Sequence, residues 1–173
     1  MISFRPFMSH QPVIDGFEFA SAGATQQGTL PLSGFPRLRD LLASDIGEVA
    51  YELQGLHDAR GRPSLRLKVR GTVQLKCQRC LEALPVRVDE DEMLVLASTQ
   101  AEIDADPADA EAPDRVLAGK EMPLRELVED QLILALPYAP RHAECGASRG
   151  AAGQGEDRLS PFAGLKGLLR GRH

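Results

Sequence analysis

The residues of this chain that are best suited to chemistry form two closely spaced pairs, Cys77 with Cys80 and His142 with Cys145. Two thiolates separated by two residues can occupy two corners of a tetrahedral zinc site. A histidine nitrogen and a third thiolate are ordinary ligands for the other two corners. The sequence therefore predicts a Cys3His site for Zn2+ whose halves lie far apart along the chain.

Two other interpretations of the cysteines stay open at the level of sequence. Cys77 continues an apolar strand face, so it could be a core thiol, with Cys80 and Cys145 as incidental thiols. A thiol-dependent enzyme is the other alternative. Redox dithiols, however, are activated at a helix N-terminus beside a βαβ unit, and this pair lies between two expected strands.

The cysteine pair is positioned by residues 65–88, where apolar and polar side chains alternate on both sides of it. This alternation predicts a β-hairpin with one buried face, one exposed face and the cysteines at its tip. The exposed face is basic and is the predicted contact surface for RNA phosphates or a partner. Its cations are Arg66, Lys68, Arg70, Lys76 and Arg79. The same face could equally pair with acidic segments of the chain itself.

Charge is strongly segregated along the chain, although the formal net charge is only −5. Residues 60–79 contain seven basic and no acidic residues, whereas residues 82–114 contain eleven acidic residues and one basic residue. An acidic stretch of this kind could hold a basic protein partner. The sequence pI of about 5.4 is not typical of a protein that binds RNA over its whole surface.

The remaining patterns predict an α+β domain over residues 1–145, with an antiparallel, β-rich sheet. Its expected helices are a short one at 36–43 and a longer one at 123–136, in which Arg125, Glu126, Glu129 and Asp130 face water. The expected strands outside the hairpin are 13–19, 48–56, 93–97 and 115–118. Residues 89–92 are expected to form an acidic turn, and residues 98–114 a disordered acidic loop. A flexible basic tail follows at 146–173, with an amphipathic segment at 161–170.

Several function classes find no support in the sequence. It contains no glycine-rich phosphate loop, no nucleophile elbow and no recognisable histidine–carboxylate pair. We therefore expect no enzymatic activity and no small-molecule substrate. No apolar run approaches the roughly 20 residues that span a bilayer, and three cysteines suit a reducing compartment. The expected location is the cytoplasm, away from membranes.

With these features in hand, the chain resembles the YceD family, the large ribosomal RNA subunit accumulation proteins. The matching segments are CQRCLE at 77–82, LVEDQLILALP at 127–137, the residues Pro140, His142 and Cys145, and SPFAGL at 160–165. The resemblance implies a non-enzymatic role in the processing or accumulation of large-subunit 23S ribosomal RNA, and hence in ribosome biogenesis. It also implies, as a candidate partner, a small basic protein of the large ribosomal subunit.

Two mechanisms follow from the charge pattern and this resemblance. In the first, the acidic stretch 82–114 engages a basic ribosomal protein and the RNA is affected indirectly. In the second, the basic strand face and the basic tail bind ribosomal RNA directly. A zinc-knuckle module that binds nucleic acid is the alternative function, and a thiol-dependent enzyme is a more distant one.

Overall fold

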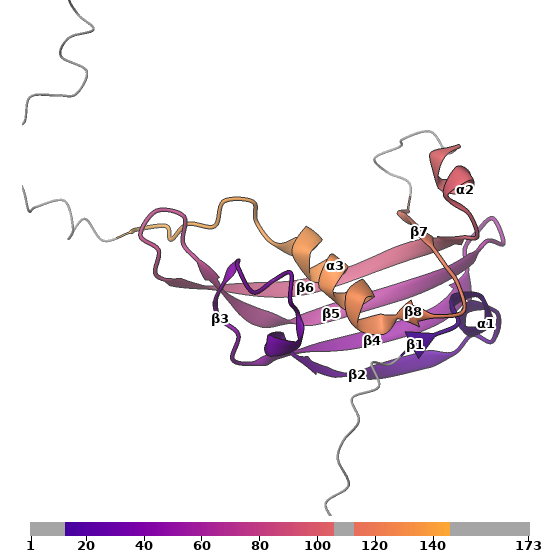
Figure 1. Cartoon of the computed structure of the whole chain (residues 1–173), viewed down its shortest axis with the longest axis horizontal. Helices are drawn as coiled ribbons and strands as arrows, with labels where there is room; N and C mark the ends of the chain where they lie inside the picture. The colour runs from indigo at the N-terminus through magenta and orange to yellow at the C-terminus, as the bar shows by residue number, and fades with distance from the viewer. Residues whose placement is uncertain (1–12, 106–112, 146–173) are drawn as a thin grey trace, which may run out of the picture. The chain divides into compact units, whose positions relative to one another are not determined.

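The computed structural model describes residues 13–105 and 113–145 (Figure 1). Its main element is a six-stranded sheet in which β2, β4, β5, β6 and β7 are neighbours in that order and β3 pairs with β5. The strands are β2 (Thr25–Pro31), β3 (Leu42–Ser44), β4 (Glu48–His57), β5 (Pro63–Lys76), β6 (Ala83–Ala97) and β7 (Arg115–Leu117). All pairings are antiparallel except that of β6 with β7, which is parallel. The predicted α+β class is confirmed.

Helix α3 (Leu124–Ala135) lies across one face of this sheet (Figure 1). Beside it lies a two-stranded ribbon of β1 (Val13–Ile14) and β8 (Met122–Pro123). The remaining helices are short. They are α1 (Gly16–Ser21), the 3-10 helix η1 (Leu32–Gly34) and α2 (Gln100–Asp104). The long helix predicted at 123–136 is therefore confirmed to within a residue at each end.

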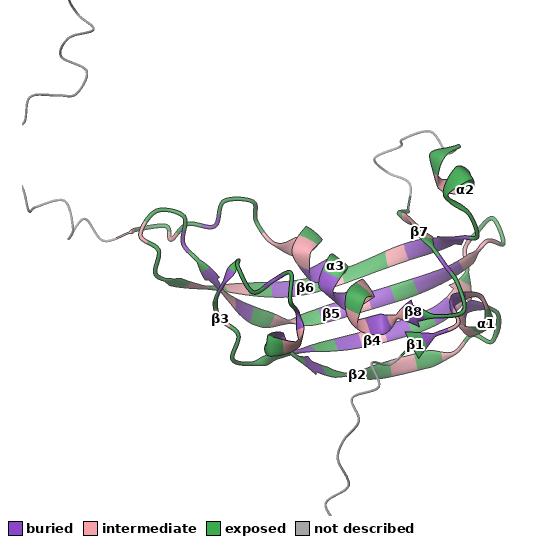
Figure 2. Ribbon diagram, viewed as in Figure 1, coloured by how far each residue is buried: buried purple, intermediate pink, exposed green. Residues whose placement is uncertain are grey.

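The alternating pattern of β5 decides which face of the sheet is buried. Leu65, Leu67, Val69, Val73 and Leu75 are almost completely buried, while the residues between them are exposed or partly exposed (Figure 2). Leu124, Val128 and Leu132 of α3 belong to the same hydrophobic cluster. Because successive strand residues point to opposite sides of a sheet, one face forms the core under α3 and the other faces water.

The acidic run 89–92 does not form the predicted turn, because β6 continues through it without interruption. The register places Asp89 opposite Arg70 and Asp91 opposite Lys68. Arg66 holds Asp91 through two hydrogen bonds of 2.6 and 2.8 Å, and Arg70 holds Asp89 at 2.8 Å. These cross-strand pairs compensate the repulsion within the run and make an extended strand favourable.

The short helix predicted at 36–43 is also wrong, since residues 36–41 form turns and residue 42 begins β3. Glu129 of α3, which was expected to face water, is only 2% exposed. Its carboxylate accepts hydrogen bonds from the backbone N–H of Arg37 (2.7 Å) and Leu38 (3.3 Å) and from Arg37 Nε (3.0 Å). The buried carboxylate thus satisfies two backbone donors that the first turn of a local helix would have left without an intrahelical partner.

The N-terminal strand and the acidic loop need smaller corrections. The strand predicted at 13–19 ends after Ile14, because Asp15 caps α1 by accepting a hydrogen bond from Glu18 N. Residues 100–104 form α2. The Thr99 hydroxyl caps its N-terminus by accepting from Glu102 N–H, and the Glu102 carboxylate accepts from Ser98 N–H in return. Residues 106–112 and the predicted tail 146–173 lie outside the described residues. The domain boundary at residue 145 therefore stays a prediction.

We expect Glu129→Gln to lower the free energy of unfolding by about 1–3 kcal/mol, because it leaves buried donors poorly satisfied. The matched control is Asp130→Asn, which removes the neighbouring, exposed partner of Arg37 Nη1 and should cost about 0–1 kcal/mol. Urea denaturation followed by circular dichroism measures both variants. Equal costs for the two variants would contradict the role assigned to the buried carboxylate.

Candidate metal centre

The four predicted ligands lie together at the end of the β5–β6 hairpin. One candidate ligand atom from each of Cys77, Cys80, His142 and Cys145 lies within 4.8 Å of every other. Cys77 is fully buried, and the other three are partly exposed. Cys145 follows His142 by three residues in the sequence.

A tight turn presents the first two sulfurs. Leu81 N–H donates to the carbonyl of Cys77 (2.9 Å), and Cys77 N–H donates to the carbonyl of Glu82 (2.9 Å). Arg79 N–H points at the sulfur of Cys77, 3.5 Å away. Leu81 has a φ of 63°, which is left-handed and unfavourable for leucine. The turn therefore holds a strained residue directly after the second cysteine, and strain of this kind is typical of functional sites.

His142 reaches the turn through the segment that follows α3. Gln78 N–H donates to the carbonyl of Pro140 (2.8 Å), which ties this segment to the hairpin tip. Nε2 of His142 lies 3.1 Å from the carbonyl of Ala83, and Nδ1 lies 3.4 Å from the sulfur of Cys80. A carbonyl can only accept, so this contact requires the hydrogen on Nε2. In the neutral ring Nδ1 then directs its lone pair toward the cysteines, as in metal-binding histidines.

The donor set fits a structural zinc ion. Ligand atoms of tetrahedral Zn2+ with thiolate ligands are about 3.5–3.8 Å apart, so small side-chain movements would close this group around an ion. Three sulfurs and one nitrogen fill all four positions and leave none for a substrate or water. The arrangement can therefore cross-link two distant segments, and its chemistry does not resemble that of a catalytic zinc site.

The predicted basic contact face is largely compensated within the sheet. Arg66 pairs with Asp91, Arg70 pairs with Asp89, and the Lys68 ammonium lies 3.6 Å from a carboxylate oxygen of Glu52. The hydrogen bond from Arg66 is the largest cause of the lowered pKa of Asp91. This part of the face thus presents balanced charge, which the sequence left open as an alternative.

The cations nearest the hairpin tip are less compensated. Lys76 Nζ donates to the backbone carbonyl of Asp40 (3.3 Å), and Arg79 is exposed in the turn. Arg87 was not among the predicted residues. Its side chain is 81% exposed, and its ion pair with Asp89 is long, at 3.6 Å. Arg87 lies opposite Thr72 on the outer face of the sheet. The alternation of β6 could have identified Arg87. We call Lys76, Arg79 and Arg87 the tip cations.

Comparison with known proteins gives one match. A family model described as "Large ribosomal RNA subunit accumulation protein YceD" matches residues 65–169, more than half of the chain. Neither the curated proteins nor the solved structures include a match to this chain.

In the described residues, no helix has the length and apolar character that crossing a membrane requires.

We expect the free energy of unfolding of Asp91→Asn to fall less steeply with decreasing pH than that of the unmodified chain. The pKa of Asp91 is lowered from its ordinary 3.8 in the folded chain. The Arg66–Asp91 pair therefore stabilises the fold above that value, and this contribution is lost as the pH falls through the lower, folded pKa. Urea denaturation at several pH values between about 5 and 2 measures the slope of the free energy of unfolding against pH.

The matched control for this titration is Glu92→Gln, one residue further along β6 and on the opposite side of the sheet from Arg66. Its slope should stay closer to that of the unmodified chain. An identical slope for Asp91→Asn and the unmodified chain would show that the pair does not contribute to stability.

Proposed function

This chain belongs to the YceD family, the large ribosomal RNA subunit accumulation proteins, and we propose that it is a non-enzymatic factor that contacts 23S ribosomal RNA through the tip of the β5–β6 hairpin. The family description gives it a role in the accumulation of large-subunit ribosomal RNA. Direct contact, the site of contact, the cytoplasmic location and the absence of enzymatic activity belong to the proposal.

The observation that carries the proposal is the uneven pairing of cations along the hairpin. Arg66 and Arg70 bind carboxylates at 2.6 and 2.8 Å, whereas Lys68 and Arg87 each lie 3.6 Å from one. Lys76 donates to a backbone carbonyl, and Lys76 and Arg79 form no ion pair within the described residues. Phosphates bind most favourably to cations that no carboxylate already neutralises. Beside them, Leu81 is 74% exposed, and its side chain could contact an unstacked base.

The metal centre would hold this contact surface in place. Arg79 lies between the two cysteines of the turn, so fixing both sulfurs fixes the backbone that carries its side chain. Bound zinc would supply a structural cross-link between the hairpin tip and the segment after α3, through Cys77, Cys80, His142 and Cys145. Zinc of this kind stabilises a fold directly, because a preformed site does not exist in the unfolded chain.

We expect a tip variant, Lys76→Gln with Arg79→Gln and Arg87→Gln, to bind a 23S ribosomal RNA transcript more weakly. Losing three phosphate contacts should reduce the slope of log affinity against log salt by about 2. The matched control, Arg66→Gln with Lys68→Gln and Arg70→Gln, removes the same charge from the compensated face. Filter binding or fluorescence anisotropy at several salt concentrations measures all three proteins.

The comparison between the two triple variants separates the mechanisms. A larger loss in the control would place the RNA on the strand face predicted from the sequence and would overturn the contact at the tip. Unchanged RNA affinity in both variants would overturn direct binding through this hairpin and would favour action through a ribosomal protein.

We expect about one zinc per chain in protein purified under reducing conditions, with a thermal midpoint that falls on chelation. His142→Ala should weaken metal binding, since Nδ1 is the only nitrogen in the group. The matched control is His57→Ala at the end of β4, which should retain the metal. Metal analysis and thermal denaturation provide the readouts. A folded, reduced, metal-free chain that does not respond to added zinc would make the cysteines structural thiols only.

A further inference from the structure

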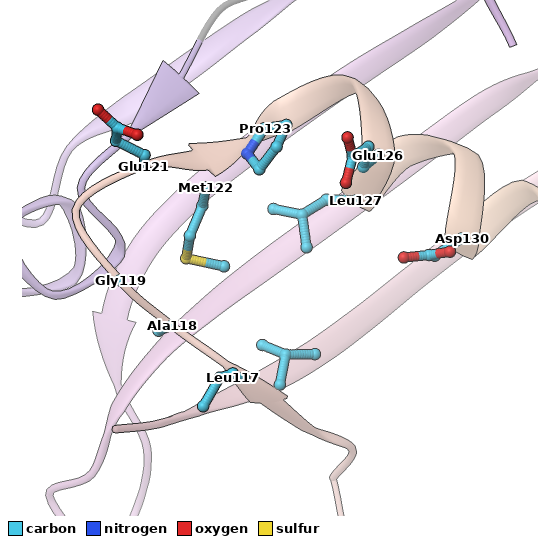
Figure 3. Close-up of a pocket in the computed structure, with 10 residues that line it drawn as sticks. Leu117, Ala118, Gly119, Glu121, Met122, Pro123, Glu126, Leu127 and Asp130 are labelled. Carbon is cyan, nitrogen blue, oxygen red and sulfur yellow. The ribbon is translucent and has the colours of Figure 1, made fainter. Parts of the chain in front are cut away.

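A groove lies between α3 and the connector that runs from β7 to β8 (Figure 3). Its volume is about 510 Å3, which is within the range of pockets that hold several side chains or a small molecule. Met122 and Leu127 project into the space between the connector and the helix, and Asp130 points into it from the next helical turn (Figure 3). Its lining includes Val116 and Leu117 and the acids Glu121, Glu126 and Asp130.

The apolar part of this groove remains open to solvent. Leu117 of β7 is 56% exposed, and Leu127 is only partly buried although it packs against the core. Leu134 follows Leu127 by two helical turns, on the same side of α3, and is 70% exposed. Single exposed apolar residues need no explanation, but Leu117 and Leu127 line the same groove, and exposed apolar residues that line a groove are characteristic of an interaction surface.

The edge of the groove is acidic. Glu121 and Glu126 form no ion pair within the described ranges, whereas Asp130 shares the guanidinium of Arg37 with Glu129. Glu90 and Glu92 lie on the same face of β6 as Leu94, toward α3 and away from the charge pairs of the outer face. β7 pairs with β6 only from Val95 onward, so the acidic part of β6 borders a strand edge that β7 does not cover.

We infer that this groove docks a protein segment that carries both large apolar and basic side chains. Apolar side chains of such a segment would fill the space between Leu117 and Leu127, and its cations would lie beside Glu121 and Glu126. Nucleic acid is disfavoured, because its phosphates would be repelled by the acidic rim. The inference is independent of RNA contact at the hairpin tip, which uses residues of opposite charge on other elements.

The test uses the full chain and synthetic peptides in which leucine and lysine alternate at helical spacing, measured by fluorescence anisotropy. Amide chemical shifts of the isotope-labelled chain should change around residues 116–134 when this peptide binds. The double variant Glu121→Lys with Glu126→Lys should weaken binding at least about tenfold, through loss of attraction and new repulsion. A Leu117→Ser variant should weaken it through the apolar contact.

Matched controls separate specific docking from general attraction to an acidic protein. Asp45→Lys with Glu48→Lys makes the same charge change at exposed sites outside the groove and should leave the affinity nearly unchanged. A peptide with serine in place of leucine should bind weakly, and one with glutamate in place of lysine should not bind. Equal losses in the two double variants, or shift changes outside the groove only, would overturn the inference.

The RNA measurement is kept separate from this test. The tip variant should bind the leucine–lysine peptide normally, and the groove variant should bind the 23S transcript normally. Loss of both ligands in the groove variant, with an unchanged circular dichroism spectrum, would show that the surfaces are not independent and would overturn that part of the inference.

Discussion

The register between β5 and β6 is the constraint on which the rest of the structure depends. It pairs residues 64–76 with residues 83–95, so two long strands share one apolar and one charged face. A shift by one residue would move Leu67, Val69 and Val73 to the outer side and place Arg66 and Arg70 against α3. Both the apolar core and the cross-strand ion pairs oppose such a shift, and each supports the other.

The same register determines where charge remains available. Carboxylates of β6 and β4 compensate the central cations of β5, whereas Lys76 and Arg79 at the end of the hairpin form no ion pair within the described residues and Arg87 shares Asp89 with Arg70. On the other side of the sheet, acids of α3 and of the connector surround an apolar groove. A single small domain thus carries a basic surface and an acidic surface on different elements. Such a separation would let one chain contact RNA and a basic protein at the same time. The family's role in ribosomal RNA accumulation is compatible with both contacts.

The cluster of three cysteines and one histidine depends on the hairpin and on α3 together. The sheet places Cys77 and Cys80 at a tip, and the end of α3 directs Pro140 and His142 back to that tip. Glu129 contributes indirectly, because its bonds to Arg37 and Leu38 attach α3 to the loop before β3. A long separation in sequence makes such a site entropically costly to assemble. Its formation therefore relies on packing that is already complete.

The sequence alone determined the central hairpin, the long helix and the identity of the four clustered residues. Strict alternation, a helical stripe and short Cys/His spacings are local patterns, and local physics decides them. It did not determine that residues 36–41 form turns before β3, that 89–92 continues a strand, or that Glu129 is buried. In each case a partner distant in sequence satisfied the polar groups: Glu129 for Arg37 and Leu38, and Arg66 and Arg70 for the acidic run. Only the tertiary structure decided which cations of the β5–β6 hairpin stay available and where an acidic groove forms. Both depend on which side chains meet across neighbouring strands and beside α3.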